Sequence, residues 1–225
     1  MTFLLIANFK SHKTTSDVED WLAQVGPHAS NSSAKVIVAP SFPHLPILNS
    51  QIANTNYKIE IGSQDVSPYP VGSYTGAVNA SQLKDLGVDY CLIGHSERRR
   101  YFHETAIDVA GKARELVSVG ITPVLCMSSG DIKPQFAALD ENLSSSIIFA
   151  YEPPEDIGKS ETAPVDDIAA AVQLVKSLSA GRPVIYGGGV TASNIEPIKP
   201  LVDGALVATA SLVASSFIDI INHFN

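Results

Sequence analysis

Two short phrases in this chain end a strand-forming run at a single ionisable side chain. The run Leu92-Ile93-Gly94 stops at His95, and the run Ala150-Tyr151 stops at Glu152. Imidazole and carboxylate groups are the side chains that most often carry protons in enzymes. The pair therefore predicts acid–base chemistry, such as the movement of a proton beside a carbonyl group.

The elements that must position these groups alternate along the chain. Eight nearly continuous apolar runs predict strands at Phe3–Ala7, Lys35–Ala39, Lys58–Gly62, Tyr90–Ile93, Thr122–Leu125, Ile147–Tyr151, Pro183–Tyr186 and Ala205–Val207. Runs without polar alternation are typical of strands buried on both faces of a parallel sheet. Helices are predicted at Asp17–Val25 (with Ser16 as N-cap), Ser81–Leu86, Glu104–Val119, Val165–Ser179 and Ser211–His223.

This alternation favours a closed (β/α)8 barrel, with residues 1–225 forming a single domain. The polar segment Ser128–Ser146, after the fifth strand, has room for only a short helix. An open doubly wound sheet is the alternative. No Gly-x-Gly-x-x-Gly follows the first strand, which argues against dinucleotide binding.

Composition excludes several classes of protein. The hydrophobic content of 45% argues against disorder, and the net charge of −8 argues against nucleic-acid binding. The two cysteines lie in apolar runs, as reduced core thiols of a cytoplasmic protein do. The apolar run at the N-terminus is too short for a signal peptide, and no stretch is long enough to span a membrane.

In a barrel, the residues that follow each strand share one face of the molecule. That face would hold Asn8, Lys10, Gln64, His95, Glu152, the turn Gly187–Gly189, Ala208 and Thr209. Turns after the seventh and eighth strands commonly bind phosphate in barrels. The residues thus predict an acid–base enzyme acting on a small phosphorylated molecule, and no metal-ligand spacing stands out.

At these residues the chain resembles the triosephosphate isomerase family over its whole length. The matching phrases are Asn8-Phe9-Lys10, Gly62–Ser67, Gly72–Gly76, Gly94–Arg99, Tyr151-Glu152-Pro153, Tyr186–Val190 and Ala210-Ser211-Leu212. Each phrase is weak alone, but seven in the right order are hard to obtain otherwise.

The resemblance implies a role for each residue. It also implies a reaction that needs neither cofactor nor metal. Glu152 would be the base, His95 would polarise the carbonyl group, and Lys10 would stabilise the developing negative charge. Asn8 would hydrogen-bond near the reacting oxygens, and Glu97 would support Lys10. Residues 153–159 would form a lid over the phosphate group. The substrate and its phosphate group would be bound by Asn8, Lys10 and the backbone N–H groups of Gly158, Gly189, Ala208 and Thr209.

Departures from the family pattern leave alternatives open. Ala208-Thr209 replaces the usual Gly-Gly, Gly189 replaces a serine, and the lid phrase is of a short form. An isomerase of a related small sugar phosphate, such as a tetrose phosphate, and a non-catalytic phosphometabolite-binding barrel are the two alternatives. The loop Val71–Gly76 resembles the one that a neighbouring subunit receives. It predicts a homodimer, with a tetramer possible.

Overall fold

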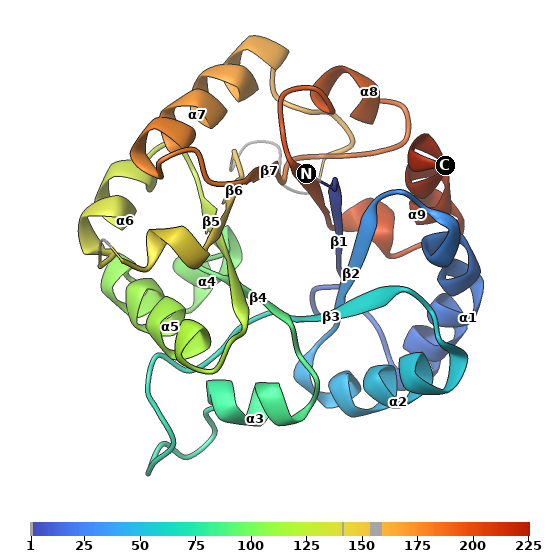
Figure 1. Cartoon of the computed structure of the whole chain (residues 1–225), viewed down its shortest axis with the longest axis horizontal. Helices are drawn as coiled ribbons and strands as arrows, with labels where there is room; N and C mark the ends of the chain where they lie inside the picture. Colours follow the sequence, from blue (N-terminus) through green and yellow to red (C-terminus); the bar gives the residue numbers. More distant parts are fainter. Residues whose placement is uncertain (1, 141, 154–158) are drawn as a thin grey trace.

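The computed structural model describes residues 2–140, 142–153 and 159–225. Its eight strands form a closed parallel barrel in chain order, with the helices arranged around it (Figure 1). The strands are β1 (Leu4–Asn8), β2 (Lys35–Ala39), β3 (Ile59–Ser63), β4 (Tyr90–Ile93), β5 (Thr122–Met127), β6 (Ile148–Tyr151), β7 (Val184–Tyr186) and β8 (Gly204–Val207). The predicted (β/α)8 barrel is confirmed, and each strand lies within about two residues of its predicted position.

The continuous apolar runs are explained by two cores, one on each face of the sheet. Successive side chains of a strand point to opposite faces. In β1, Leu4 and Ile6 belong to the cluster inside the barrel, whereas Leu5 and Ala7 belong to the cluster between strands and helices. Because both faces are buried, no position along the strand calls for a polar residue.

The helices complete each βα unit. The α-helices are α1 (Thr15–Asn31), α2 (Leu45–Thr55), α3 (Ala80–Asp85), α4 (Ser96–Tyr101), α5 (Ala106–Ser118), α6 (Ile132–Ala138), α7 (Val165–Leu178), α8 (Ile195–Ile198) and α9 (Ala214–Ile221). The 3₁₀ helices are η1 (Phe42–His44), η2 (Ser144–Ser146), η3 (Thr209–Ser211) and η4 (Asn222–Phe224). The short helix predicted after the fifth strand is confirmed by the seven residues of α6.

The first helix is longer than predicted at both ends. Its N-cap is Thr14 rather than Ser16, because Thr14 and Asp17 cap each other's backbone N–H groups in a capping box. The helix also continues through Pro27 to Asn31. Burial of Ala29 against the barrel favours helical backbone beyond the proline, so tertiary packing overrides the local stop signal.

One further prediction of helix bounds was wrong, and one helix was missed. The residues predicted as a single last helix from Ser211 are divided, because Ser211 ends η3 and α9 begins only at Ala214. Helix α2 was not predicted. It contributes Leu45 and Leu48 to the core, both with fully buried side chains. Across the described ranges, no helix combines the length and apolar character that crossing a membrane requires.

Candidate active site

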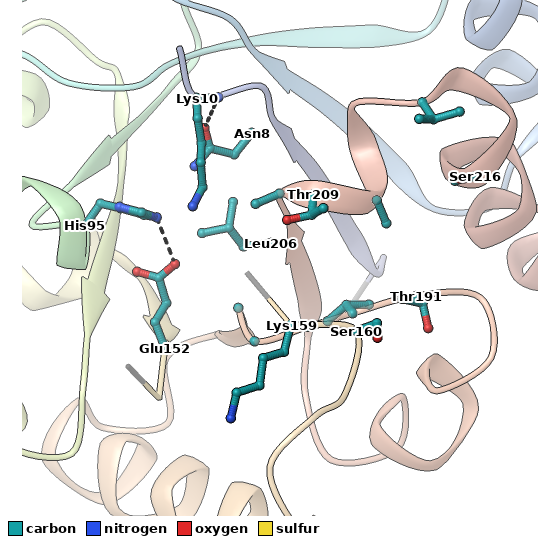
Figure 2. A pocket seen from close by; sticks show the side chains of 17 residues that line it. Asn8, Lys10, His95, Glu152, Lys159, Ser160, Thr191, Leu206, Thr209 and Ser216 are labelled. Carbon is teal, nitrogen blue, oxygen red and sulfur yellow. Dashed lines mark hydrogen bonds and ion pairs between the residues drawn. The ribbon is translucent and has the colours of Figure 1, made fainter. Parts of the chain in front are cut away.

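The strand ends converge on a pocket of about 300 Å³. Nine of the residues predicted to follow the strands line it: Asn8, Lys10, His95, Glu152, Gly187, Gly188, Gly189, Ala208 and Thr209. Figure 2 shows His95 and Glu152 on one side of this pocket and Thr209 across it. Two proton carriers, a cation and the glycine-rich turn are therefore brought together from β1, β4, β6, β7 and β8.

His95 and Glu152 point toward each other. His95 Nε2 lies 3.4 Å from Glu152 Oε1 (dashed in Figure 2), and the two side chains are 7% and 4% exposed. Few water molecules can reach groups buried to this extent, so interactions between them are stronger than on the surface. The pair can pass protons to and from a molecule bound above it.

The orientation of the His95 ring is set by its place at the start of α4. His95 is the N-cap of this helix, and its Nδ1 accepts a hydrogen bond from the backbone N–H of Glu97 at 3.2 Å. A ring nitrogen that accepts carries no proton, so the proton lies on Nε2. His95 therefore presents an N–H donor to the pocket.

Lys10 is held in a left-handed conformation with a φ of 49°. Asn8 Oδ1 accepts the backbone N–H of Lys10 at 3.0 Å, and the Lys10 carbonyl accepts from Gln64 Nε2 at 2.9 Å and Ser41 Oγ at 3.0 Å. This backbone geometry is costly for a residue with a side chain, and here three hydrogen bonds stabilise it. Gln64 therefore lies beneath Lys10 as a support.

The ammonium group of Lys10 is fixed by a carboxylate. Lys10 Nζ lies 2.5 Å from Glu97 Oε1. The same residue thus orients His95 through its backbone and Lys10 through its side chain. Glu97 lies beside the pocket residues, where the sequence placed it.

The surroundings of Glu152 favour one carboxylate position. Its Oε2 is buried and has no hydrogen-bond partner among the described residues. Gly187 leaves the space that the side chain occupies, since a Cβ at Gly187 would lie 2.9 Å from Glu152 Cγ.

Burial raises the pKa of the nearby Cys126 thiol well above its usual value, and the charge of Glu152 adds to this effect. Cys126 is therefore a neutral packing group and no nucleophile.

Backbone donors line the opposite end of the pocket. No hydrogen bond within the described residues uses the N–H groups of Gly189, Ala208 or Thr209. Free N–H groups at a pocket wall are ready to bind an anion. Gly158, also predicted to bind phosphate, lies outside the described residues together with most of the expected lid.

Sequence reasoning missed several residues that line the pocket. These are Ser160, Val190, Thr191, Leu206, Ala210, Val213 and Ser216, whereas Lys159, Gly187 and Gly188, which also line the pocket, were expected in the lid and in the turn after the seventh strand. For Leu206, the alternation along β8 could have shown that it points into the barrel.

Within the described ranges, no group of three or more His, Cys, Asp and Glu side chains is close enough together to hold a metal ion.

Comparison with known proteins decides the family. The family model for triosephosphate isomerase matches residues 3–224. The chain belongs to the triosephosphate isomerase family. It is 34% identical to a triosephosphate isomerase of Thermus thermophilus, with 96% of each chain covered. It is 33% identical to one of Francisella tularensis subsp. novicida, covering 100% of this chain and 98% of the relative. As a member of the triosephosphate isomerase family, it is an isomerase.

Proposed function

We propose that this chain interconverts dihydroxyacetone phosphate and D-glyceraldehyde 3-phosphate without a cofactor, as an enzyme of glycolysis and gluconeogenesis. The proposal is carried by the pairing of His95 Nε2 with Glu152 Oε1 at 3.4 Å in a pocket that also holds Lys10. The names of the similar proteins from Thermus thermophilus and Francisella tularensis support the same substrate.

Glu152 acts as the base. Its carboxylate takes a proton from the carbon beside the substrate carbonyl. The electrons of the broken C–H bond form the C=C bond of an enediol(ate), and the carbonyl oxygen gains negative charge. Glu152 then returns a proton to the neighbouring carbon, so the substrate is neither oxidised nor reduced overall and the carboxylate is regenerated. The unpartnered, buried Oε2 supports this role, because its acceptor capacity is left for the substrate.

His95 acts as the electrophile that polarises the carbonyl group. Its Nε2–H donates a hydrogen bond to the oxygen where charge develops, and it moves the proton between the two oxygens of the intermediate. The hydrogen bond from Glu97 N–H to Nδ1 supports this assignment, because it keeps the proton on the side facing the pocket.

Lys10 and Asn8 complete the reacting end. Lys10 supplies positive charge to the developing oxyanion and to the phosphate group, while Glu97 holds its ammonium group in place. Asn8 lines the pocket and hydrogen-bonds near the substrate oxygens. The left-handed backbone of Lys10 supports a functional role, since such strained geometry gathers at active sites.

The phosphate group is bound at the far end of the pocket. Backbone N–H groups of Gly158, Gly189, Ala208 and Thr209 donate to its oxygens. The unused donors of the three described residues support this placement. Oriented backbone N–H groups that bind a phosphate need no charged side chain of their own.

The test is the initial rate of D-glyceraldehyde 3-phosphate conversion by purified protein, with no metal or cofactor added. Triosephosphate isomerases are among the enzymes that reach the diffusional ceiling of about 10⁸ to 10⁹ M⁻¹s⁻¹. A kcat/KM of about 10⁶ M⁻¹s⁻¹ or more, toward that ceiling, is expected. A rate at the buffer background would overturn the proposal.

We also infer a homodimer formed through Val71–Gly76. The connection between β3 and α3 extends away from the barrel (Figure 1). Its Val71 and Tyr74 are 71% and 43% exposed, and Tyr74 stacks on Tyr69 at 4.7 Å between ring centroids. Phe102, beside a hollow that Tyr74 also lines, is 65% exposed. Exposed apolar patches of this kind mark protein interfaces.

Sedimentation measures the oligomer directly. A mass of twice 23.9 kDa supports the dimer, whereas four times that mass would support a tetramer. Val71→Asp is expected to yield monomers, because it places a charge in the proposed interface. Leu178→Asp on α7, at a half-exposed position, is the matched control and should leave a dimer intact.

We further propose a cytoplasmic location, which the two buried free thiols support.

A further inference from the structure

The chain that follows the expected lid packs against the turn after β7. Gly189, in that turn, has a φ of 60°, and a Cβ there would lie 2.1 Å from the carbonyl oxygen of Glu161. Nearby, the backbone N–H of Ala163 donates to Tyr186 Oη at 2.9 Å. Residues 160–163 thus pack against the Gly189 turn, and Ser160 and that turn together form one wall of the pocket.

Asn194 ties the two parts of this wall together. Its Nδ2 donates to the carbonyl oxygen of Gly189 at 2.9 Å and to that of Ser160 at 3.2 Å. Its Oδ1 accepts the backbone N–H of Thr191 at 2.8 Å. One amide group therefore links three backbone positions, and Gly189, Ser160 and Thr191 all line the pocket.

The local role expected of this asparagine is not the one it performs. Asn194 is the N-cap of α8, where an asparagine side chain normally accepts a backbone N–H of the first helical turn. Here it makes no such cap. A residue that leaves its local role for contacts elsewhere is typical of functional positions.

We propose that Asn194 is a positioning residue for the phosphate end of the pocket. By holding Ser160 against Gly189, it sets both the shape of the pocket wall and the direction of the Gly189 N–H group. This inference rests on the proposed function. The residue acts through the wall and does not touch the substrate. Its loss therefore weakens binding of the phosphate group, while proton transfer at the Glu152 end continues.

Comparing substrates with and without a phosphate group distinguishes this positioning role from a general structural role. Asn194→Ala removes both donated hydrogen bonds, and each is worth about a factor of two to ten in an equilibrium constant. We expect a rise of about tenfold in KM for D-glyceraldehyde 3-phosphate and in the dissociation constant of inorganic phosphate. Turnover of D-glyceraldehyde, which lacks the phosphate group, should stay at the wild-type rate.

Ser193→Ala is the matched control within the same turn. It removes the hydrogen bond of 2.9 Å between Ser193 Oγ and Thr191 Oγ1 but leaves Asn194 in place. We expect wild-type phosphate binding in this variant. If the alanine variant of Asn194 does not fold, Asn194→Ser replaces it, because a serine side chain is too short to reach both carbonyl groups.

The outcomes distinguish this inference from the proposed function. Equal loss of activity on both substrates, or unchanged phosphate binding, would overturn the positioning role. Absence of isomerase activity in the wild type would overturn the proposed function instead. Inorganic phosphate titrated into wild type and Asn194→Ala by calorimetry would still test whether Asn194 shapes the anion site.

Discussion

The side chain of Glu152 rests against the backbone of Gly187. A Cβ atom at Gly187 would lie 2.9 Å from Glu152 Cγ and 3.1 Å from Oε1. Any side chain at this position must therefore displace the carboxylate or shift the turn. The glycine is explained by the close approach of Glu152.

Gly187→Ala is accordingly expected to misplace the base. A displacement of about 1 Å can cost about a hundredfold in rate, so kcat should fall by about 10- to 100-fold. Steady-state kinetics with D-glyceraldehyde 3-phosphate measures this effect. Gly130→Ala is the control, because a Cβ there meets no atom closer than 3.8 Å. Equal kcat values for the two variants would contradict the argument.

Glu152→Gln should remove the base while keeping its shape. We expect a loss of about 10² to 10⁴ in kcat, the usual contribution of general acid–base catalysis, and an unchanged circular dichroism spectrum. Glu196→Gln makes the same chemical change on a carboxylate outside the pocket and should keep wild-type activity. Near-normal turnover in Glu152→Gln would refute the assigned base.

Glu97→Gln tests the support of Lys10. The backbone N–H of Glu97 still donates to His95 Nδ1 in this variant, while the ion pair with Lys10 Nζ loses its negative charge. A less constrained ammonium group should lower kcat by about tenfold, since the charge is no longer held where the oxyanion forms. An unchanged kcat would show that Lys10 needs no such partner.

Thr105 and Asp108 form a capping box at the start of α5. Hydrogen bonds from the Thr105 side chain and backbone hold the pKa of Asp108 below its usual value. A lowered pKa in the folded state stabilises the protein above the unfolded pKa of about 3.9, and this stability is lost as pH falls through the folded value. Thr105→Ala should therefore cost about 1 kcal/mol in urea unfolding at pH 7. A difference from wild type that does not shrink below about pH 3 would contradict the linkage.

The two thiols give a test of burial. Cys91 and Cys126 are fully buried, and burial raises the pKa of both. Thiolate, the reactive form, is therefore scarce in the folded protein even at pH 8. We expect a disulfide reagent to label neither cysteine in buffer and both in guanidinium chloride. Rapid labelling in buffer would show that the strands open locally.

Much of the fold was determined by the sequence alone. Buried parallel strands need apolar residues on both faces, so all eight strands were visible as continuous runs. Lys10, His95 and Glu152 could be found for a related reason. A residue directly after a barrel strand must lie at one end of the barrel, whatever the details of packing.

Helix bounds depended on tertiary contacts. The sequence near Gly26-Pro27 carries a local stop signal, yet α1 continues because Ala29 gains burial. Conversely, Ser211 does not begin α9. Its hydroxyl donates to the Ala208 carbonyl oxygen at 2.7 Å, and its backbone carbonyl accepts Trp21 Nε1 at 2.7 Å. Local propensity is weak beside such interactions.

The barrel, the family and the side chains that meet at the strand ends could all be inferred from the order of residues along the chain. The tertiary structure alone decided that His95 Nε2 faces Glu152 Oε1, that Lys10 pairs with Glu97, and that Asn194 joins Ser160 to Gly189. These contacts join residues from different βα units. Their distances follow from how the units close around the barrel, which no local pattern encodes.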